Sequence, residues 1–445
     1  MTNTRQFDIL IIGRSSGDLV LNEPHRLEFK NNAIEVYGEN GKHYHIPTDS
    51  TPSNDNDKVT ALISLDEFIE RFSHMYRWGG GAINSAQTLF NLRVPTSQMG
   101  VTVMTPSRPY LKVGNEVKDI IDFFSENNAN HCMLNYTKQN YNIVMSGENK
   151  IVVRNKPSTN EDFKLSRENM ESILGYMNPS DGILINSLNN QSMTEFIVQS
   201  VFFENQSFYK DMKIQDMSKI EEAMSDENRL PKYKHRKVMT VITNSSKIPR
   251  NTLIDKILPY TGIIINQEDI INNFYGTSKE IKKEIYDIIG NDLNLVNRNY
   301  NPIIKVIAQM RFGIPTEHGV KRYVEDSKNN IYVTLGKHGH LISIENKVYH
   351  VRIKEEIIEY INEKIKQNKS STNGAGDAFA AGIIHEETIG NGQDYLKTAA
   401  FANTAVARYL GINLDIISSE VEVLKEYDLN KFKSDENLYR MNLKN

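Results

Sequence analysis

The chain alternates short, continuous apolar runs with longer stretches of mixed polar and apolar residues. The continuous runs predict buried strands, which we place at Phe7 to Ile12, Ser97 to Val103, Gly182 to Asn186, Lys237 to Ile242, Thr261 to Ile265 and Asn330 to Leu335. Helices are predicted at Leu65 to Met75, Ala82 to Asn91, Ile120 to Asn127 and Gly374 to His385. Because strands that alternate with helices form sheets covered on both faces, we expect an α/β fold with a mostly parallel central sheet.

Two pairs of short strands interrupt this alternation. They are predicted at Ala33 to Tyr37 with His43 to Ile46, and at Asn142 to Ser146 with Lys150 to Arg154. Neither pair is large enough to bury a face by itself, so we expect the two to pair with each other as a small β lid over the edge of the main sheet. The predicted domains are an α/β domain of residues 1–18, 60–138 and 156–445, and a lid of residues 19–59 and 139–155. Asn205 to Arg236 and Gly276 to Asn329 look like insertions, the second with at least one extra helix.

The composition is that of an ordinary globular protein. Hydrophobic residues make up 39% of the 445 positions and charged residues 24%, and the net charge of -4 gives no general attraction to nucleic acid or an anionic membrane. No apolar run approaches the roughly 20 residues of a membrane-spanning helix, so we expect a cytoplasmic protein. The single cysteine, Cys132, excludes a disulfide within one chain and a cysteine-based zinc site, and we expect it to be a small buried thiol.

The most informative segment is Ser371-Thr372-Asn373-Gly374-Ala375-Gly376-Asp377, which leads into an apolar helix. Its small residues allow the backbone to turn tightly and to bring N–H groups up to a ligand. A helix start carries roughly half a positive charge, which suits a phosphate group. A carboxylate in that first turn can accept a proton from a substrate hydroxyl. An ordinary helix start with an acid in its first turn is the alternative for this segment taken alone.

This segment resembles the C-terminal signature of the ribokinase (PfkB) family of carbohydrate kinases, Asp-Thr-x-Gly-Ala-Gly-Asp. The resemblance implies a ribokinase-like three-layer sandwich with a small β lid, in which Asp377 is the catalytic base and also contacts the substrate. It also implies that the amides of Gly374, Ala375 and Gly376 form an anion hole. Ser371 stands where the family has its first Asp, which helps to hold a monovalent cation. Whether this protein binds such a cation is therefore left open.

Two earlier segments resemble motifs that bind the substrate in the same family. Gly79 to Ala86 resembles its Gly-Gly turn followed by an Asn, which implies substrate contacts from Gly80, Gly81 and Asn84. Asp18 matches the acid that binds substrate hydroxyls after the first strand. A dinucleotide-binding start at Gly13 to Gly17 is the competing interpretation, but this segment lacks the third glycine and no amphipathic helix follows it.

Three later segments resemble motifs that lie beside the nucleotide in this family. Asn266-Gln267-Glu268-Asp269 resembles the family's Asn-x-x-Glu, which implies that Asn266 borders the nucleotide and that Asp269 or Glu268 meets magnesium through water. The loop that begins at Thr334 resembles Thr-x-Gly-x-x-Gly, whose matching positions are Thr334, Gly336 and Gly339. Asn403 matches an Asn that faces the purine. Each of these segments alone also fits routine turn and helix packing.

Together these segments predict an ATP-dependent kinase that uses Mg²⁺ and transfers the γ-phosphoryl group to a hydroxyl of a small sugar or sugar-like substrate. A nucleoside kinase of the same fold, or a non-catalytic nucleotide- or metabolite-binding protein, are the alternatives. We expect no nucleic-acid or membrane partner. The resemblance also implies a homodimer that forms through the lid.

Overall fold

The structure is a computed structural model in which the described residues are 7–21, 25–38, 41, 43–49, 58–60, 62, 74–92, 99–105, 110–113, 116–133, 141–146, 150–154, 167–177, 180–186, 188, 191–202, 237–243, 257, 261–275, 278–290, 298–312, 314–316, 319–321, 330–368, 374–389, 394–413 and 420–432. The predicted helix at Leu65 to Met75 and the segment Asn205 to Arg236 lie almost wholly outside these residues. None of the helices in these ranges is long and apolar enough to cross a membrane.

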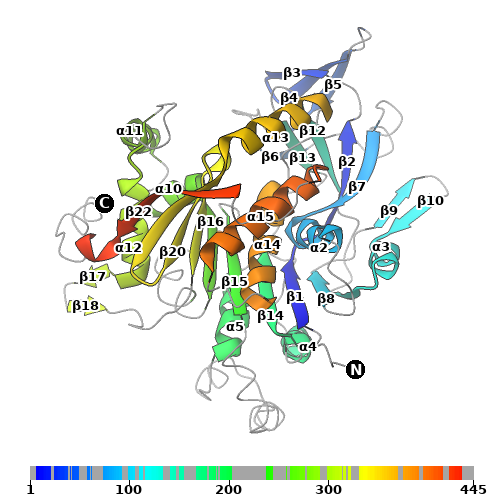
Figure 1. Ribbon diagram of the computed structural model, residues 1–445. Coiled ribbons are helices and arrows are strands. Elements are labelled where there is room, and N and C mark those ends of the chain that lie inside the picture. Colours follow the sequence, from blue (N-terminus) through cyan, green and yellow to red (C-terminus); the bar gives the residue numbers. More distant parts are fainter. Residues whose placement is uncertain are drawn as a thin grey trace.

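A ten-stranded sheet forms the centre of the molecule (Figure 1). In spatial order its strands are β11 (Asn130–Met133), β8 (Met99–Thr105), β1 (Phe7–Gly13), β14 (Gly182–Asn186), β15 (Lys237–Ile242), β16 (Gly262–Asn266), β19 (Ile331–Thr334), β20 (His340–Ile344), β21 (Lys347–Ile353) and β22 (Val421–Asp428). Pairing is parallel from β11 to β19 and antiparallel from β19 to β22. The predicted mostly parallel α/β sheet is therefore confirmed.

The register brings polar strand ends together at one edge. Gly13 at the end of β1 pairs with Asn186 at the end of β14, and Asn266 at the end of β16 pairs with Thr334 at the end of β19. Parallel strands have their carboxyl ends at the same edge of the sheet, where open α/β sheets bind ligands. Both the early and the late motifs therefore reach one edge.

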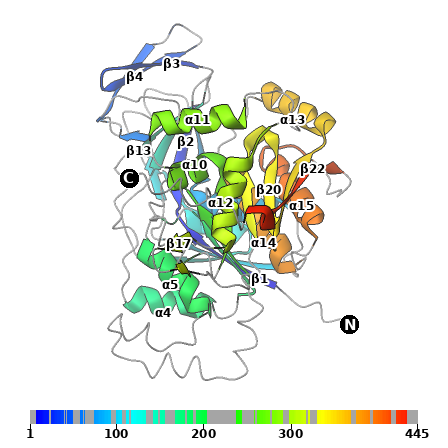
Figure 2. The ribbon, with the colours of Figure 1, turned by 90° about the vertical axis from the view of Figure 1, so that its left-hand side faces the viewer.

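Two helical layers cover the sheet because successive strand residues point to opposite faces. Leu10 and Ile12 face a core with helices α4 (Arg167–Met177), α5 (Gln191–Phe202), α10 (Gln267–Tyr275), α11 (Lys279–Ile289) and α12 (Asn301–Phe312). Ile9 and Ile11 face a second core with helices α2 (Gly81–Asn91), α3 (Ile120–Glu126), α14 (Ala375–Ile389) and α15 (Tyr395–Tyr409). Figure 2 shows α10 and α12 on the side of the sheet opposite to α14 and α15, so the predicted three-layer sandwich is confirmed.

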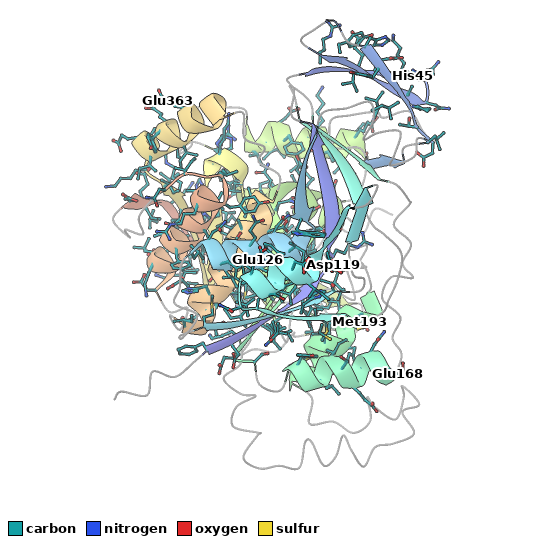
Figure 3. The ribbon with its side chains drawn as sticks, turned by 90° about the vertical axis from the view of Figure 1, so that its right-hand side faces the viewer. His45, Asp119, Glu126, Glu168, Met193 and Glu363 are labelled. Carbon is teal, nitrogen blue, oxygen red and sulfur yellow. The ribbon has the colours of Figure 1, made fainter. Side chains whose placement is uncertain are left out.

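Smaller sheets accompany the main sheet, and the two larger of them lie beyond the carboxyl end of β1 (Figure 1). One has five strands in the order β6 (Lys58–Thr60), β13 (Lys150–Arg154), β12 (Tyr141–Ser146), β2 (Ser16–Leu21) and β7 (His74–Gly79). Another has three strands, β3 (His25–Lys30), β4 (Ala33–Gly38) and β5 (His43–Pro47), and it projects from one end of the molecule, where Figure 3 labels His45. Two-stranded sheets are formed by β9 (Tyr110–Val113) with β10 (Glu116–Asp119) and by β17 (Ile314–Thr316) with β18 (Gly319–Lys321).

The predicted pairing between the two short strand pairs is wrong. They lie in different sheets, because β12 pairs in parallel with β2, the strand that follows β1, and β4 pairs with β3. The polar stretch after Asp18 therefore supplies more strands than its composition indicates. Small antiparallel sheets beside the main sheet are nevertheless present, as the predicted fold requires.

Two smaller predictions have clear outcomes. The segment Gly276 to Asn329 contains α11 and α12, which confirms the extra helix, and Ile303 and Ile307 of α12 are fully buried in the main core. Cys132 is half-buried rather than buried, with its Sγ 3.6 Å from the Ser172 hydroxyl. Helix α13 (Glu355–Asn368) and the short 3₁₀ helices η6 (Gly336–His338) and η8 (Leu429–Phe432) complete the described elements.

Candidate functional site

The Asp377 carboxylate lies in the first turn of α14 and is held by amides from two other elements. Asn84 of α2 donates from Nδ2 to Asp377 Oδ2 at 2.8 Å. Asn186, at the end of β14, donates from Nδ2 to Asp377 Oδ1 at 3.0 Å. Each carboxylate oxygen therefore has a neutral N–H donor.

The turn into α14 requires glycine. Gly374 has φ 88°, a value that residues with a Cβ rarely adopt. A Cβ there would lie 2.3 Å from Tyr409 Oη and 3.0 Å from Asn84 Nδ2. Tyr409 ends α15 and donates its hydroxyl to Asn84 Oδ1 at 3.2 Å. The predicted anion-hole turn thus packs directly against the side chains that hold the predicted base.

The Gly-Gly turn at the start of α2 lies against the end of β1. Gly80 has φ 91°, and a Cβ on it would meet the Arg14 carbonyl oxygen at 2.6 Å. The amide of Ala82 donates to that same oxygen at 3.1 Å. Asn84 follows one turn later and is 6% exposed. Because Asn84 already contacts Asp377 and Tyr409, it is engaged with the predicted base as well as being a predicted substrate ligand.

The remaining early residues lie around this turn. Gly81 begins α2 and is buried, and its carbonyl oxygen accepts from Asn186 Nδ2 at 3.1 Å. Asp18 lies in β2, opposite Arg77 of β7 and Asn142 of β12, while its side chain falls outside the described part of the structure. Asp18 therefore lies on β2, the strand of the five-stranded sheet that directly follows the carboxyl end of β1.

The Asn-x-x-Asp segment forms a local cap at the start of α10. Asn266 donates from Nδ2 to Asp269 Oδ2 at 2.5 Å, and the amide of Asp269 donates back to Asn266 Oδ1 at 2.7 Å. Asp269 is 5% exposed and Glu268 is exposed. Burial, with Glu268 and Asp269 nearby, raises the pKa of the Tyr286 phenol. Among the described residues, no group of three or more His, Cys, Asp or Glu side chains could hold a metal ion directly.

The loop after β19 is a tight turn beside Asn266. Thr334 pairs with Asn266, and the Leu335 amide donates to the Gly339 carbonyl at 2.8 Å across the 3₁₀ turn that begins at Gly336. Burial, followed by the nearby Arg298 and Lys337 charges, lowers the pKa of His338 to about 4. His338 is therefore neutral at pH 7, and Lys337 is the cation that this loop presents to solvent.

Asn403 carries a buried and unpaired amide on α15. Its Nδ2 atom is buried and has no hydrogen-bond partner among the residues that the structure describes. Leaving a buried donor unsatisfied costs about 1–3 kcal/mol, and an acceptor atom on a bound base would remove that cost. The contact between Asn403 and a purine stays a prediction, because neighbouring atoms would have to move before a base could reach this nitrogen.

Sequence reasoning missed three residues that contact the predicted site. Asn186 and Tyr409 are described above, and the Ser85 hydroxyl donates to the Asp377 carbonyl oxygen at 3.0 Å. The available signal was weak: Asn186 is the polar residue that ends a continuous apolar strand, where α/β sheets place ligand-binding groups. Ser85 and Tyr409 carried no comparable signal.

Comparison with solved structures finds this architecture in kinases. Adenosine kinase from Schistosoma mansoni in complex with 2-fluoroadenosine has a TM-score of 0.52 at 13% identity and matches 90% of this chain and 94% of its own. The same enzyme in complex with adenosine has a TM-score of 0.52 at 12% identity, with 96% and 98% covered. Anopheles gambiae adenosine kinase in complex with P1,P4-di(adenosine-5) tetraphosphate has a TM-score of 0.50 at 13% identity, with 92% and 99% covered.

Sequence comparison alone finds no relative: no protein-family model and no curated protein sequence matches this chain. The structural likeness extends over nearly the whole chain, and at these identities it establishes the architecture rather than the reaction. The chain therefore has the ribokinase-like kinase fold.

Proposed function

We propose that this protein is an ATP-dependent kinase that phosphorylates a hydroxyl of a small sugar or sugar-like molecule. The observation that carries the proposal is the Asp377 carboxylate, fixed by Asn84 and Asn186 in the first turn of α14. This turn lies at the same sheet edge as Asn266 and Thr334. A base and an N-terminal helix turn beside the nucleotide loops are the parts that phosphoryl transfer to an alcohol needs.

In the proposed reaction, Asp377 accepts the proton of the acceptor hydroxyl as its oxygen attacks the γ-phosphorus of ATP. The bond from that phosphorus to the β,γ-bridging oxygen breaks, and ADP leaves. Helix starts have backbone amides without intrahelical acceptors, and here the amides of Gly374, Ala375 and Gly376 would stabilise the transferring phosphoryl group. One such donor is worth about 3–4 kcal/mol in other group-transfer enzymes.

Three features support nucleotide binding at the β16–β19 side of the edge. Asn403 Nδ2 is buried without a partner among the described residues. The Thr334 to Gly339 loop turns tightly beside Asn266, with Gly336 and Gly339 at its bends. Mg²⁺, which would neutralise phosphate charge, would be held through water by Asp269 or Glu268, since Mg²⁺ usually keeps several waters.

The acceptor would bind between the Gly80–Gly81 turn and Asp18, with Asn84 and Asp377 beneath it. Residues 19–59 and 139–155, which we propose as the lid, would exclude water that otherwise hydrolyses ATP. A homodimer that pairs through this lid belongs to the same proposal.

The deciding experiment is an ADP-release assay on the purified full chain with MgATP. The acceptors are D-ribose, D-fructose, fructose 6-phosphate, D-gluconate and adenosine, and the Asp377→Asn variant prepared in parallel measures contaminating kinase activity. We expect acceptor-dependent ADP release well above this blank with at least one sugar. Release with adenosine alone would make the protein a nucleoside kinase, and thermal shifts with ligands but no release would make it a binding protein.

A further inference from the structure

Asn186 is a fully buried side chain at the meeting point of three elements. It is 0% exposed and ends β14, the strand between β1 and β15 near the middle of the main sheet. Its Nδ2 atom lies 3.1 Å from the Gly81 carbonyl oxygen, 2.9 Å from Ser85 Oγ and 3.0 Å from Asp377 Oδ1. One amide therefore connects the start of α2 with the start of α14.

The backbone of Asn186 is held more firmly than the groups that it contacts. It pairs with Gly13 of β1 on one side and with Val241 of β15 on the other, so both neighbouring strands fix its position. Asp377, by contrast, is half-buried in the first turn of a helix, where the backbone hydrogen bonds are incomplete. The sheet thus provides a fixed reference to which the carboxylate is bound.

The chemical type of this contact is informative. An amide N–H restrains a carboxylate oxygen without cancelling its charge, whereas a Lys or Arg at the same distance would pair with the negative charge that a base needs. Asn84 makes the equivalent contact on the other oxygen at 2.8 Å. Two neutral donors, one on each oxygen, therefore define the plane of the carboxylate.

We propose that Asn186 is a positioning residue for phosphoryl transfer, which fixes the Asp377 carboxylate relative to the substrate-binding turn at the start of α2. This inference rests on the proposed kinase function. Asn186 acts through Asp377 and Gly81 rather than by touching the reacting atoms. Its loss lowers kcat and leaves the KM for MgATP unchanged, because the nucleotide loops lie on other strands.

The test compares Asn186→Leu with a matched control, Thr240→Val. Leucine is similar in size to asparagine but has no N–H donor. Thr240 is also buried, at 1% exposure, and its hydroxyl lies 3.0 Å from Thr261 Oγ1, so its loss removes a buried hydrogen bond between β15 and the residue before β16. If Asn186→Leu fails to fold, Asn186→Ser replaces it, because its hydroxyl is too short to reach Asp377 and water can fill the space.

The measurements are kcat and the KM for MgATP with each of the five acceptors of the ADP-release panel, and the melting temperature of each variant. We expect kcat of Asn186→Leu to fall ~10²-fold, the effect of a misplacement of about 1 Å, with the KM for MgATP within twofold of the wild type. Thr240→Val should have a lower melting temperature than the wild type and the same kcat.

Wild-type kcat in Asn186→Leu, or equal losses of kcat in Asn186→Leu and Thr240→Val, would overturn the positioning role while the kinase function stands. An inactive wild type with all five acceptors would overturn the kinase function, and this inference with it. The wild-type rate therefore separates the two failures.

Discussion

Two of the carboxylates on helix α14, Asp377 and Glu387, lie at opposite ends of the helix. Asp377 lies in its first turn, and Glu387 lies near its end at 3% exposure. Glu387 accepts from the Tyr332 hydroxyl at 2.6 Å and from Asn330 Nδ2 at 2.6 Å, and Lys237 Nζ lies 3.5 Å from its other oxygen. Burial, followed by the Glu387 charge, raises the pKa of Tyr332 well above its usual value, so its hydroxyl stays a donor.

The two carboxylates differ in their partners. Glu387 is surrounded by a hydroxyl, an amide and an ammonium group, the arrangement that a buried charge needs for stability. Asp377 accepts hydrogen bonds from two neutral amides, is half-buried, and follows Gly376, where a Cβ would meet nothing within 4 Å. The first arrangement pairs the carboxylate with an ammonium group, whereas the two amides of the second position a half-buried carboxylate. This difference leads us to assign stability to one end of α14 and chemistry to the other.

Replacing Asp377 should have the largest effect. In Asp377→Asn the base is lost, so we expect phosphoryl transfer to fall ~10²-fold or more while MgADP binding stays close to normal. The measurements are single-turnover transfer and the rise in melting temperature with MgADP. The control is Asp122→Asn, an exposed acid in the first turn of α3, the helix whose ends Figure 3 marks at Asp119 and Glu126. Turnover near the wild-type rate in Asp377→Asn would rule out the base assignment.

Removing Glu387 should change stability instead. Glu387→Ala leaves the fully buried Tyr332 hydroxyl and Asn330 without their acceptor, so we expect the free energy of unfolding to fall by about 2–4 kcal/mol. Because the site lies at the opposite end of α14, kcat of the folded enzyme should be unchanged. Chemical denaturation measures the first quantity and the ADP-release assay the second. Glu363→Ala, an exposed residue of α13 labelled in Figure 3, should change stability by less than about 0.5 kcal/mol. A large drop in kcat for Glu387→Ala would undermine the division between the two ends of α14.

Replacing Gly374, which begins the turn into α14, should lower stability by a smaller amount. Gly374→Ala forces a Cβ to within 2.3 Å of Tyr409 Oη at a φ of 88°, and we expect a loss of about 1–2 kcal/mol of stability. Gly376→Ala is the matched control, because a Cβ there meets nothing within 4 Å. It should be at least as stable as the wild type, since alanine favours helices over glycine by about 1 kcal/mol. Equal melting temperatures for the two variants would show that the close packing of Tyr409 against the turn is absent in solution.

The sequence predicted the local parts of this site well. The strand at Lys237 to Ile242 has the predicted bounds, and α14 starts one residue after the predicted Gly374, because apolar runs and glycine turns are local signals. The order of the motifs along the chain also indicated the ribokinase-like fold. These predictions needed no knowledge of which strand lies beside which.

The parts that sequence could not supply depend on long-range pairing. Asn186 and Asp377 are 191 positions apart, and they meet only because α14 packs against β14. The small sheets show the same limit. Strand β12 pairs with β2, more than a hundred residues earlier in the chain, whereas we predicted that the two short strand pairs would pair with each other. The periodicity of a single sequence predicts where strands lie, but which strands pair with each other depends on the packing of the whole chain.

The smallest effect concerns the hydroxyl of Tyr409, which ties the two halves of the Asp377 site together. Tyr409→Phe keeps the ring beside Gly374 and removes the 3.2 Å hydrogen bond to Asn84 Oδ1. A neutral hydrogen bond contributes about 0.5–1.5 kcal/mol, so we expect kcat to fall by a factor of ~2–10, with the KM for MgATP unchanged. Tyr395→Phe, in the first turn of the same helix, is the control, because Tyr395 stacks on Tyr349 with a centroid distance of 4.2 Å and contacts neither Asn84 nor Asp377. If the two variants have the same kcat, Asn84 holds the carboxylate without help from α15, and Asn186 and Asn84 alone distinguish this end of α14 from the end that carries Glu387.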